Sequence, residues 1–182
     1  SIWDDVIAAL PGGYGVLTYD LRGHGLSGGE ADSIEGLAGD VGGLIDALGI
    51  TDVVFCGVSI GGMIGQVLAA TRGDVVRGAV LCCTASRIGT IARWTERINA
   101  VESVGTEGIA RDVVAGWFGH AYAALADRMV LHEAMISRVS DAGYIAACRA
   151  IRDADLTGQA RAIEIPVLCV SGQEDQSVSP DA

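Results

Sequence analysis

The feature that most restricts the fold is an 18-residue run without a charged side chain, from Val53 to Ala70. Such a run is long enough to cross a membrane, and Gly57, Gly61 and Gly65 repeat every four residues as in paired transmembrane helices. However, it begins with β-branched and aromatic residues, continues with helical spacing, and is diluted by four glycines. We therefore predict a buried strand that turns sharply into a buried helix.

The rest of the chain alternates between apolar strands and amphipathic helices. The patterns predict strands at 15–19, 53–58, 76–83 and 166–170, and helices at 32–48 and 60–70. Strands that are apolar on both faces and separated by helices favour a mostly parallel sheet covered on both sides. Residues 88–161 are almost wholly helical in character and too long for an ordinary crossover. We interpret them as a helical cap over the carboxyl edge of the sheet.

Charge and cysteine content exclude several classes of function. Twelve Lys and Arg against 23 Asp and Glu give a net charge of −11, which disfavours binding to nucleic acid or to an anionic membrane. Five cysteines, an odd number in apolar surroundings, predict buried free thiols in a reducing cytoplasm. No cysteine or histidine pair has zinc-ligand spacing, and the first residues do not resemble a signal peptide.

The sharpest motif is G-x-S-x-G at Gly57-Val58-Ser59-Ile60-Gly61, placed between the predicted strand and helix. This is the context of a nucleophile elbow, in which a strained turn lifts the serine above the sheet. We expect crowding to require glycine at Gly57 and Gly61 and to favour it at Gly62. The Ser59 hydroxyl would lie at the positive end of the helix, with the N–H of Ile60 facing a developing oxyanion.

A second glycine motif, G-x-G-x-x-G at Gly23 to Gly28, raises the alternative of a dinucleotide site. It fails two requirements of that site. Three residues separate its last glycine from the predicted helix, and Ser59 stands where an acidic residue should follow the next strand.

A serine nucleophile also needs an acid and a base. Asp175 follows the fourth predicted strand, where it would orient an imidazole. In hydrolases with such an elbow the histidine comes last, but none of the seven residues after Asp175 is His. We assign His24 to a structural role and His120 and His132 to cap packing or the surface.

Several stretches together resemble the 3-oxoadipate enol-lactonase family of the α/β-hydrolase superfamily. The superfamily motifs are Tyr19-Asp20-Leu21-Arg22-Gly23-His24-Gly25-Leu26-Ser27 and the elbow followed by Gly62. The more specific stretches are Cys83 to Gly89, Trp94 to Ile98, Trp117-Phe118 and Gly143 to Leu156. The resemblance covers essentially the whole chain.

The resemblance implies an α/β-hydrolase core at 1–86, the cap at 87–161, and the acid-bearing strand and loop of the core at 162–182. It implies that Ser59 opens the lactone ring of 3-oxoadipate enol-lactone to 3-oxoadipate in aromatic catabolism, with no metal or organic cofactor. The substrate carries a carboxylate, so we expect one of three arginines at the start of the cap, Arg87, Arg93 or Arg97 and foremost Arg87, to contact it together with Trp94. Any of these arginines, Arg87 included, could instead form a surface ion pair.

Parts of the family pattern are absent from the 182 residues. The loop that supplies the second oxyanion N–H, the N-terminal and C-terminal strands, and the catalytic histidine expected beyond Ala182 are missing. We therefore expect a fragment that is inactive alone. Another small-ester hydrolase, a cofactor-free perhydrolase and a non-catalytic binding protein of the same fold remain alternatives, and the oligomeric state stays open.

Overall fold

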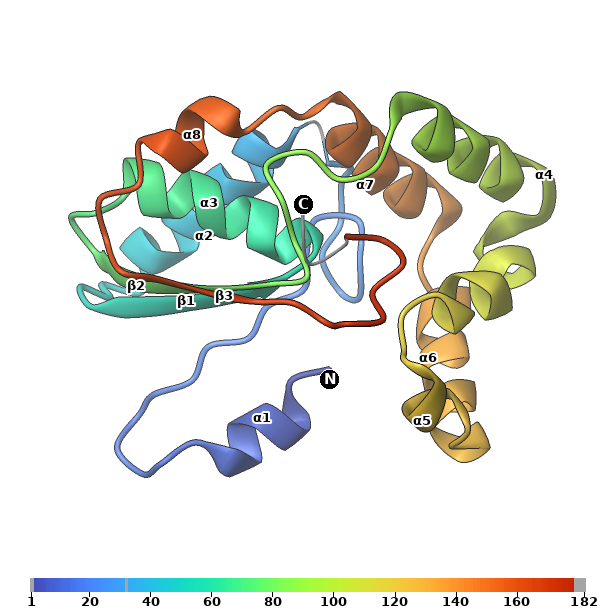
Figure 1. The fold of residues 1–182 in the computed structure, drawn as a ribbon. Helices are drawn as coiled ribbons and strands as arrows, with labels where there is room; N and C mark the ends of the chain where they lie inside the picture. The colour runs from blue at the N-terminus through green and yellow to red at the C-terminus, as the bar shows by residue number, and fades with distance from the viewer. Residues whose placement is uncertain (1, 32, 179–182) are drawn as a thin grey trace.

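A computed structural model describes residues 2–31 and 33–178 (Figure 1). Its centre is a three-stranded parallel sheet of order β1-β2-β3. The strands are β1 (Val53–Val58), β2 (Val76–Cys82) and β3 (Val167–Val170). The helices are α1 (Asp4–Ala9), α2 (Ile34–Ala47), α3 (Ile60–Thr71), α4 (Ile91–Ala115), α5 (His120–Ala123), α6 (Ala126–Ser137), α7 (Asp141–Asp153) and α8 (Thr157–Arg161). These elements confirm the predicted α/β class and the strand-to-helix reading of the uncharged run.

The strand register brings the carboxyl ends of all three strands to one edge. Val58 pairs with Cys82, and Cys82 pairs with Val170. Beyond these pairs the Ser59 N–H donates to the carbonyl of Cys82 at 2.9 Å, and the Cys83 N–H donates to the carbonyl of Val170 at 2.8 Å. The residues that follow each strand therefore emerge side by side.

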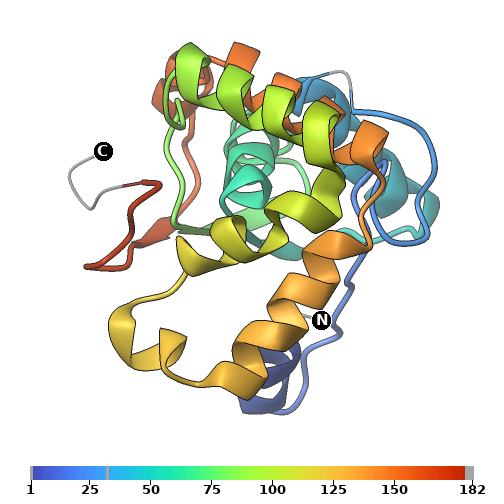
Figure 2. The same ribbon diagram turned by 90° about the vertical axis from the view of Figure 1, so that its right-hand side faces the viewer.

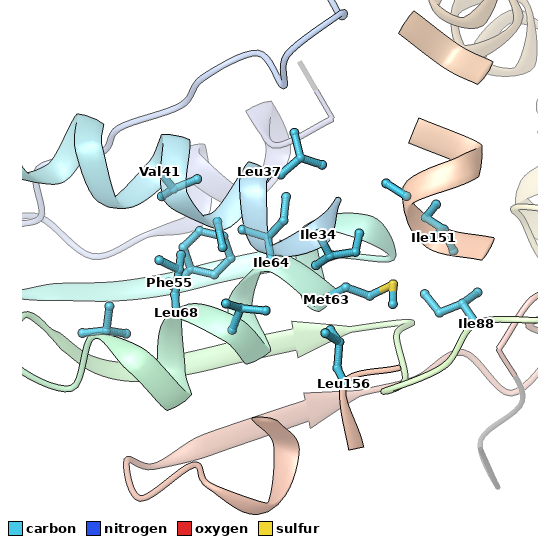
Figure 3. Close-up of a cluster of buried hydrophobic side chains, with 14 of the residues drawn as sticks. Ile34, Leu37, Val41, Phe55, Met63, Ile64, Leu68, Ile88, Ile151 and Leu156 are labelled. Carbon is cyan, nitrogen blue, oxygen red and sulfur yellow. The ribbon is translucent and has the colours of Figure 1, made fainter. Parts of the chain in front are cut away.

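The main core lies between the sheet and the helices α2 and α3. Figure 3 shows a cluster of its side chains, which come from α2, α3, β1 and the first and last parts of the helical insertion. Its members include Ile34, Leu37, Val41, Phe55, Met63, Ile64, Leu68, Ile88, Ile151 and Leu156. Helix α2 begins as its pattern predicts, because the Ser33 hydroxyl accepts the Gly36 N–H at 3.0 Å, and Gly49 follows its end with φ +64°.

The long helical insertion lies beside the carboxyl ends of the strands (Figures 1 and 2). Helix α4 packs against α6 and α7 and bends at Gly105, where φ is 71°. At that bend the Thr106 N–H donates to an Asp141 oxygen at 2.7 Å, and the buried Thr106 hydroxyl donates to the Val139 carbonyl at 2.9 Å. The last helix, α8, instead packs on α3, and Leu156 before it is fully buried in the main core.

Two expectations from the sequence are wrong for the residues that the structure describes. Residues 15–19 form no ladder with another strand, and Val16 and Leu17 are about half exposed, so β-forming residues alone do not make a strand without a partner. The sheet is also expected to be covered on both faces, but the described helices cover only one of them. On the other face Val54 of β1 is 64% exposed and Leu168 of β3 is 59% exposed.

The prediction that the cysteines are buried holds for only one of the five. Cys148 is buried, as predicted, but Cys56 and Cys169 are exposed and Cys82 and Cys83 are partly exposed. Cys56 and Cys82 stand on the uncovered face, and Cys169 stands on β3 at the rim of the sheet. None of the helices in the described part of the chain is long and apolar enough to cross a membrane.

Candidate active site

Ser59 occupies a strained backbone conformation at the junction of β1 and α3. It has φ 55° and ψ −117°, a combination that a residue with a Cβ rarely adopts. Such a conformation costs about 1–3 kcal/mol and persists only where the surroundings impose it. The predicted sharp turn between strand and helix is therefore present.

Hydrogen bonds from two elements hold this turn. The Ser59 N–H donates to the carbonyl of Cys82 at the end of β2. The Ser59 carbonyl accepts from the Met63 N–H at 3.1 Å and from the Thr84 hydroxyl at 2.8 Å. Thr84 lies in the family-specific stretch Cys83 to Gly89, but the sequence analysis gives it no role of its own, because a threonine two residues after a strand carries no distinctive signal.

The Ser59 side chain does not cap the helix that follows it. Ser33, Thr90 and Ser140 precede α2, α4 and α7 with extended backbones, and each accepts an N–H three residues on. Ser59 precedes α3 without making such a bond. The Ser59 hydroxyl therefore does not cap the helix, as a serine at this position usually does. The first N–H groups of α3 point toward the same end of the helix.

Close packing explains two of the three glycines around the turn. A Cβ at Gly57 would overlap the carbonyl of Gly61, and a Cβ at Gly62 would overlap the side chain of Thr84. At Gly61 itself a Cβ would meet no described atom within 4 Å. The expectation that Gly61 needs to be glycine is therefore wrong; its backbone, not its missing side chain, excludes a Cβ at Gly57.

Asp175 lies in the loop after β3, at the same edge of the sheet as Ser59. Its Oδ1 accepts the N–H groups of Ser177 at 2.7 Å and Val178 at 3.0 Å, which fixes the carboxylate relative to its own loop. Burial raises the pKa of the Cys83 thiol, and the Asp175 carboxylate beside it raises that pKa further. The loop after β3 therefore meets the end of β2 at this carboxylate.

The three histidines have contacts of their own. His24 Nδ1 lies 3.3 Å from the Arg22 carbonyl, and His132 Nε2 lies 3.3 Å from the Tyr122 hydroxyl. The His132 ring also packs on Phe118 with 4.7 Å between centroids, while His120 is exposed. Across residues 2–31 and 33–178 no hydrogen bond joins an imidazole to Ser59 or Asp175.

Arg87 and Trp94, the residues foremost predicted to bind substrate, both make polar contacts within the protein. Arg87 Nη1 lies 3.1 Å from Asp155 Oδ2, with side-chain exposures of 66% and 48%. Hydrogen bonds from Thr157, and to a lesser extent the positive charge of Arg87, lower the pKa of Asp155. The Trp94 indole N–H donates to the Ile88 carbonyl at 2.5 Å, and its ring packs against the main core. Arg87 is thus found in the surface ion pair named as its alternative.

The second glycine motif forms a compact loop and not a helix start. The Gly23 N–H donates to the Ser27 carbonyl at 3.0 Å, and a Cβ at Gly23 would overlap the backbone of Gly143 in α7.

A hollow of about 400 Å³ lies between this loop and α2, and a smaller one of about 60 Å³ lies where α2 begins. Neither is lined by Ser59 or Asp175. The described residues contain no group of three or more His, Cys, Asp or Glu side chains placed to hold a metal.

A serine on a strained bend between a parallel strand and a helix, with an acid at the same sheet edge and helices inserted before it, defines an α/β hydrolase. Residues 1–181 match the model described as "Alpha/beta hydrolase family", and the chain belongs to that family.

Within the family the chain is similar to enol-lactonases. It is 33% identical to 3-oxoadipate enol-lactonase 2 of Acinetobacter baylyi over 180 residues. That alignment covers 96% of this chain and 67% of the relative. It is 32% identical over 179 residues to 3-oxoadipate enol-lactonase 1 of the same organism, 96% of this chain and 66% of that one. Among solved structures, the enol-lactonase from Burkholderia xenovorans LB400 superposes with a TM-score of 0.94 at 36% identity, covering 99% of this chain and 70% of that chain. The chain therefore spans about two thirds of the length of these relatives.

Proposed function

We propose that the whole protein is a serine hydrolase that opens the lactone ring of 3-oxoadipate enol-lactone in aromatic catabolism. The observation that carries the proposal is the strained backbone of Ser59 together with its hydroxyl, which caps no helix. The identity to two curated enol-lactonases over nearly the whole chain supports this substrate class.

In the proposed reaction the Ser59 hydroxyl attacks the lactone carbonyl while a base takes its proton. The oxyanion forms beside the N–H of Ile60 and a second N–H, and each such donor contributes about 3 kcal/mol or more. Collapse of the oxyanion breaks the ring C–O bond, and the departing oxygen takes the proton back as an enol. Water then hydrolyses the acyl-serine, and the enol tautomerises to 3-oxoadipate. Asp175 would orient the imidazole that carries the proton.

The 182 residues alone are proposed to turn over negligibly. In the described part of the chain no imidazole hydrogen-bonds to Ser59 or Asp175, and loss of one triad member costs orders of magnitude in kcat. Clear hydrolysis of the lactone by the isolated chain, abolished by Ser59→Ala, would contradict this part of the proposal. The proposal includes a cytoplasmic location, small-molecule substrates and no nucleic-acid partner.

The experiment is a comparison of the whole protein with its Ser59→Ala variant on the enol-lactone and on a neutral aryl ester. We expect Ser59→Ala to lower kcat by about 10³-fold or more on both substrates, and the lactone to have the higher kcat/KM in the parent protein. A preference for the aryl ester would favour the alternative of a general small-ester hydrolase or perhydrolase. No Ser59-dependent turnover of either substrate would favour a non-catalytic binding protein.

A further inference from the structure

The loop that carries Asp175 is anchored at both of its ends. At its start the sheet continues through the hydrogen bond from the Cys83 N–H to the Val170 carbonyl. At its end Val178 is 6% exposed and belongs to the main core. The Asp175 carboxylate accepts the N–H groups of Ser177 and Val178, so its position follows the backbone of this end of the loop.

Arg93, in the first turn of α4, reaches the middle of this loop. Its Nη1 donates to the Gln176 carbonyl at 3.4 Å, and its Nη2 donates to the Ser177 hydroxyl at 3.3 Å. The Arg93 N–H donates to the Thr90 hydroxyl at 3.2 Å, which fixes the start of the helix that carries it. In the described part of the chain these are the hydrogen bonds that reach Gln176 and Ser177 from outside their loop.

A second element of the cap contacts the residue on the other side of the acid. Glu174 Oε2 accepts the His120 N–H at 2.9 Å, at the start of α5. The two residues following Asp175 are therefore held by α4, and the residue preceding it is held by α5. Figure 1 shows the loop after β3 running between the end of the sheet and these cap helices.

We propose that Arg93 is a positioning residue: it holds the segment after Asp175 to the cap and thereby fixes the carboxylate that orients the catalytic base. This inference rests on the function proposed above for Ser59 and Asp175. Arg93 does not touch the reacting atoms in this role; it acts through the backbone that binds the carboxylate. A displacement of about 1 Å in such a group costs up to about a hundredfold in rate.

A competing role for Arg93 is direct binding of the substrate carboxylate. The two roles predict different kinetics. A carboxylate-binding arginine lowers the affinity for the charged lactone when it is removed, with no effect on a neutral ester. A positioning arginine lowers kcat on both substrates, because both use the same acid and base.

The test uses the whole protein and its Arg93→Ala, Arg93→Lys and Arg111→Ala variants, assayed on the enol-lactone and a neutral aryl ester across pH. Arg111 is exposed on the same helix and serves as the matched control. We expect Arg93→Ala to lower kcat about 10- to 100-fold on both substrates with little change in KM. A less well-placed Asp175 stabilises the protonated base less, so the acidic limb of the kcat/KM profile should move to lower pH. Arg93→Lys should recover part of the loss.

Two further variants keep the outcome interpretable. Ser177→Ala removes one contact of Arg93 without a change in charge, and it serves as the test if Arg93→Ala does not fold. We expect it to lower kcat on both substrates by a smaller factor than Arg93→Ala. Unchanged kcat on both substrates in these variants would overturn the inference, as would a rise in KM confined to the lactone. If Ser59→Ala retains hydrolysis, the proposed function fails instead, and the two failures are distinguishable.

Discussion

The Thr84 hydroxyl donates a 2.8 Å hydrogen bond to the carbonyl of Ser59, and its methyl group lies where a Cβ at Gly62 would be. One side chain after β2 thus holds the turn at Ser59 by a hydrogen bond and packs against the first turn of α3. The strained serine is a property of two strands and a helix together, and not of the five-residue motif alone.

Replacement of this hydroxyl should loosen the turn. We expect Thr84→Val, which keeps the shape, to lower the free energy of unfolding by about 1 kcal/mol or more, because the partly buried Ser59 carbonyl loses a donor. It should also lower kcat. Thr84→Ser keeps the donor and should retain most of both properties in chemical denaturation and steady-state assays. Equal losses in the two variants would contradict a role for the hydrogen bond.

The glycines of the motif should differ sharply in tolerance. Gly57→Ala forces a Cβ into the Gly61 carbonyl and should destabilise the whole protein by about 2 kcal/mol or more, measured by urea unfolding. Gly61→Ala places its Cβ in open space on a helix and should be neutral or stabilising by up to about 1 kcal/mol. The reverse order would show that the described turn geometry is wrong.

Much of this architecture could be predicted from the sequence, because each predicted element rests on a local signal. Strand β1 and helix α3 appear at the predicted residues, since one apolar run with glycines at its bend has few other ways to fold. The expected strand at 15–19 failed because pairing depends on a neighbour and not on propensity.

The contacts around the site were beyond the reach of sequence patterns. Thr84 and Arg93 meet Ser59 and the acid loop across 25 and 83–84 positions respectively, and no local spacing encodes such pairs. The predicted choice of Arg87 over its neighbours rested on position in the cap alone. In the structure it is the guanidinium of Arg93 that hydrogen-bonds to the loop of Asp175.

Arg87 provides a test of the expected substrate carboxylate site. Its ion pair with Asp155 is exposed, so Arg87→Ala should change the free energy of unfolding by less than about 0.5 kcal/mol. If Arg87 binds the substrate, KM for the enol-lactone should rise in this variant while KM for a neutral ester stays constant. Unchanged lactone KM in both Arg87→Ala and Arg97→Ala would remove these two arginines from the site.

Cys148 should make the stability of the protein depend on pH in the alkaline range. Burial raises the pKa of this thiol from 9.0 to about 11. The unfolded chain therefore loses its proton first, so the stabilising contribution is full below pH 9 and is lost as pH rises through 11. Cys148→Ala should flatten this part of the stability curve, measured by urea unfolding at several pH values. An equally steep decline in the variant would contradict the assignment.

The most direct test of Ser59 as the nucleophile is labelling of the whole protein with a fluorophosphonate, followed by mass analysis of the labelled peptide. We predict one covalent adduct on Ser59, loss of lactone hydrolysis in proportion to labelling, and no adduct on the Ser59→Ala variant. A protein that resists the reagent at Ser59 while it hydrolyses the lactone, or a Ser59→Ala variant that hydrolyses the lactone at the parent rate, would contradict that role.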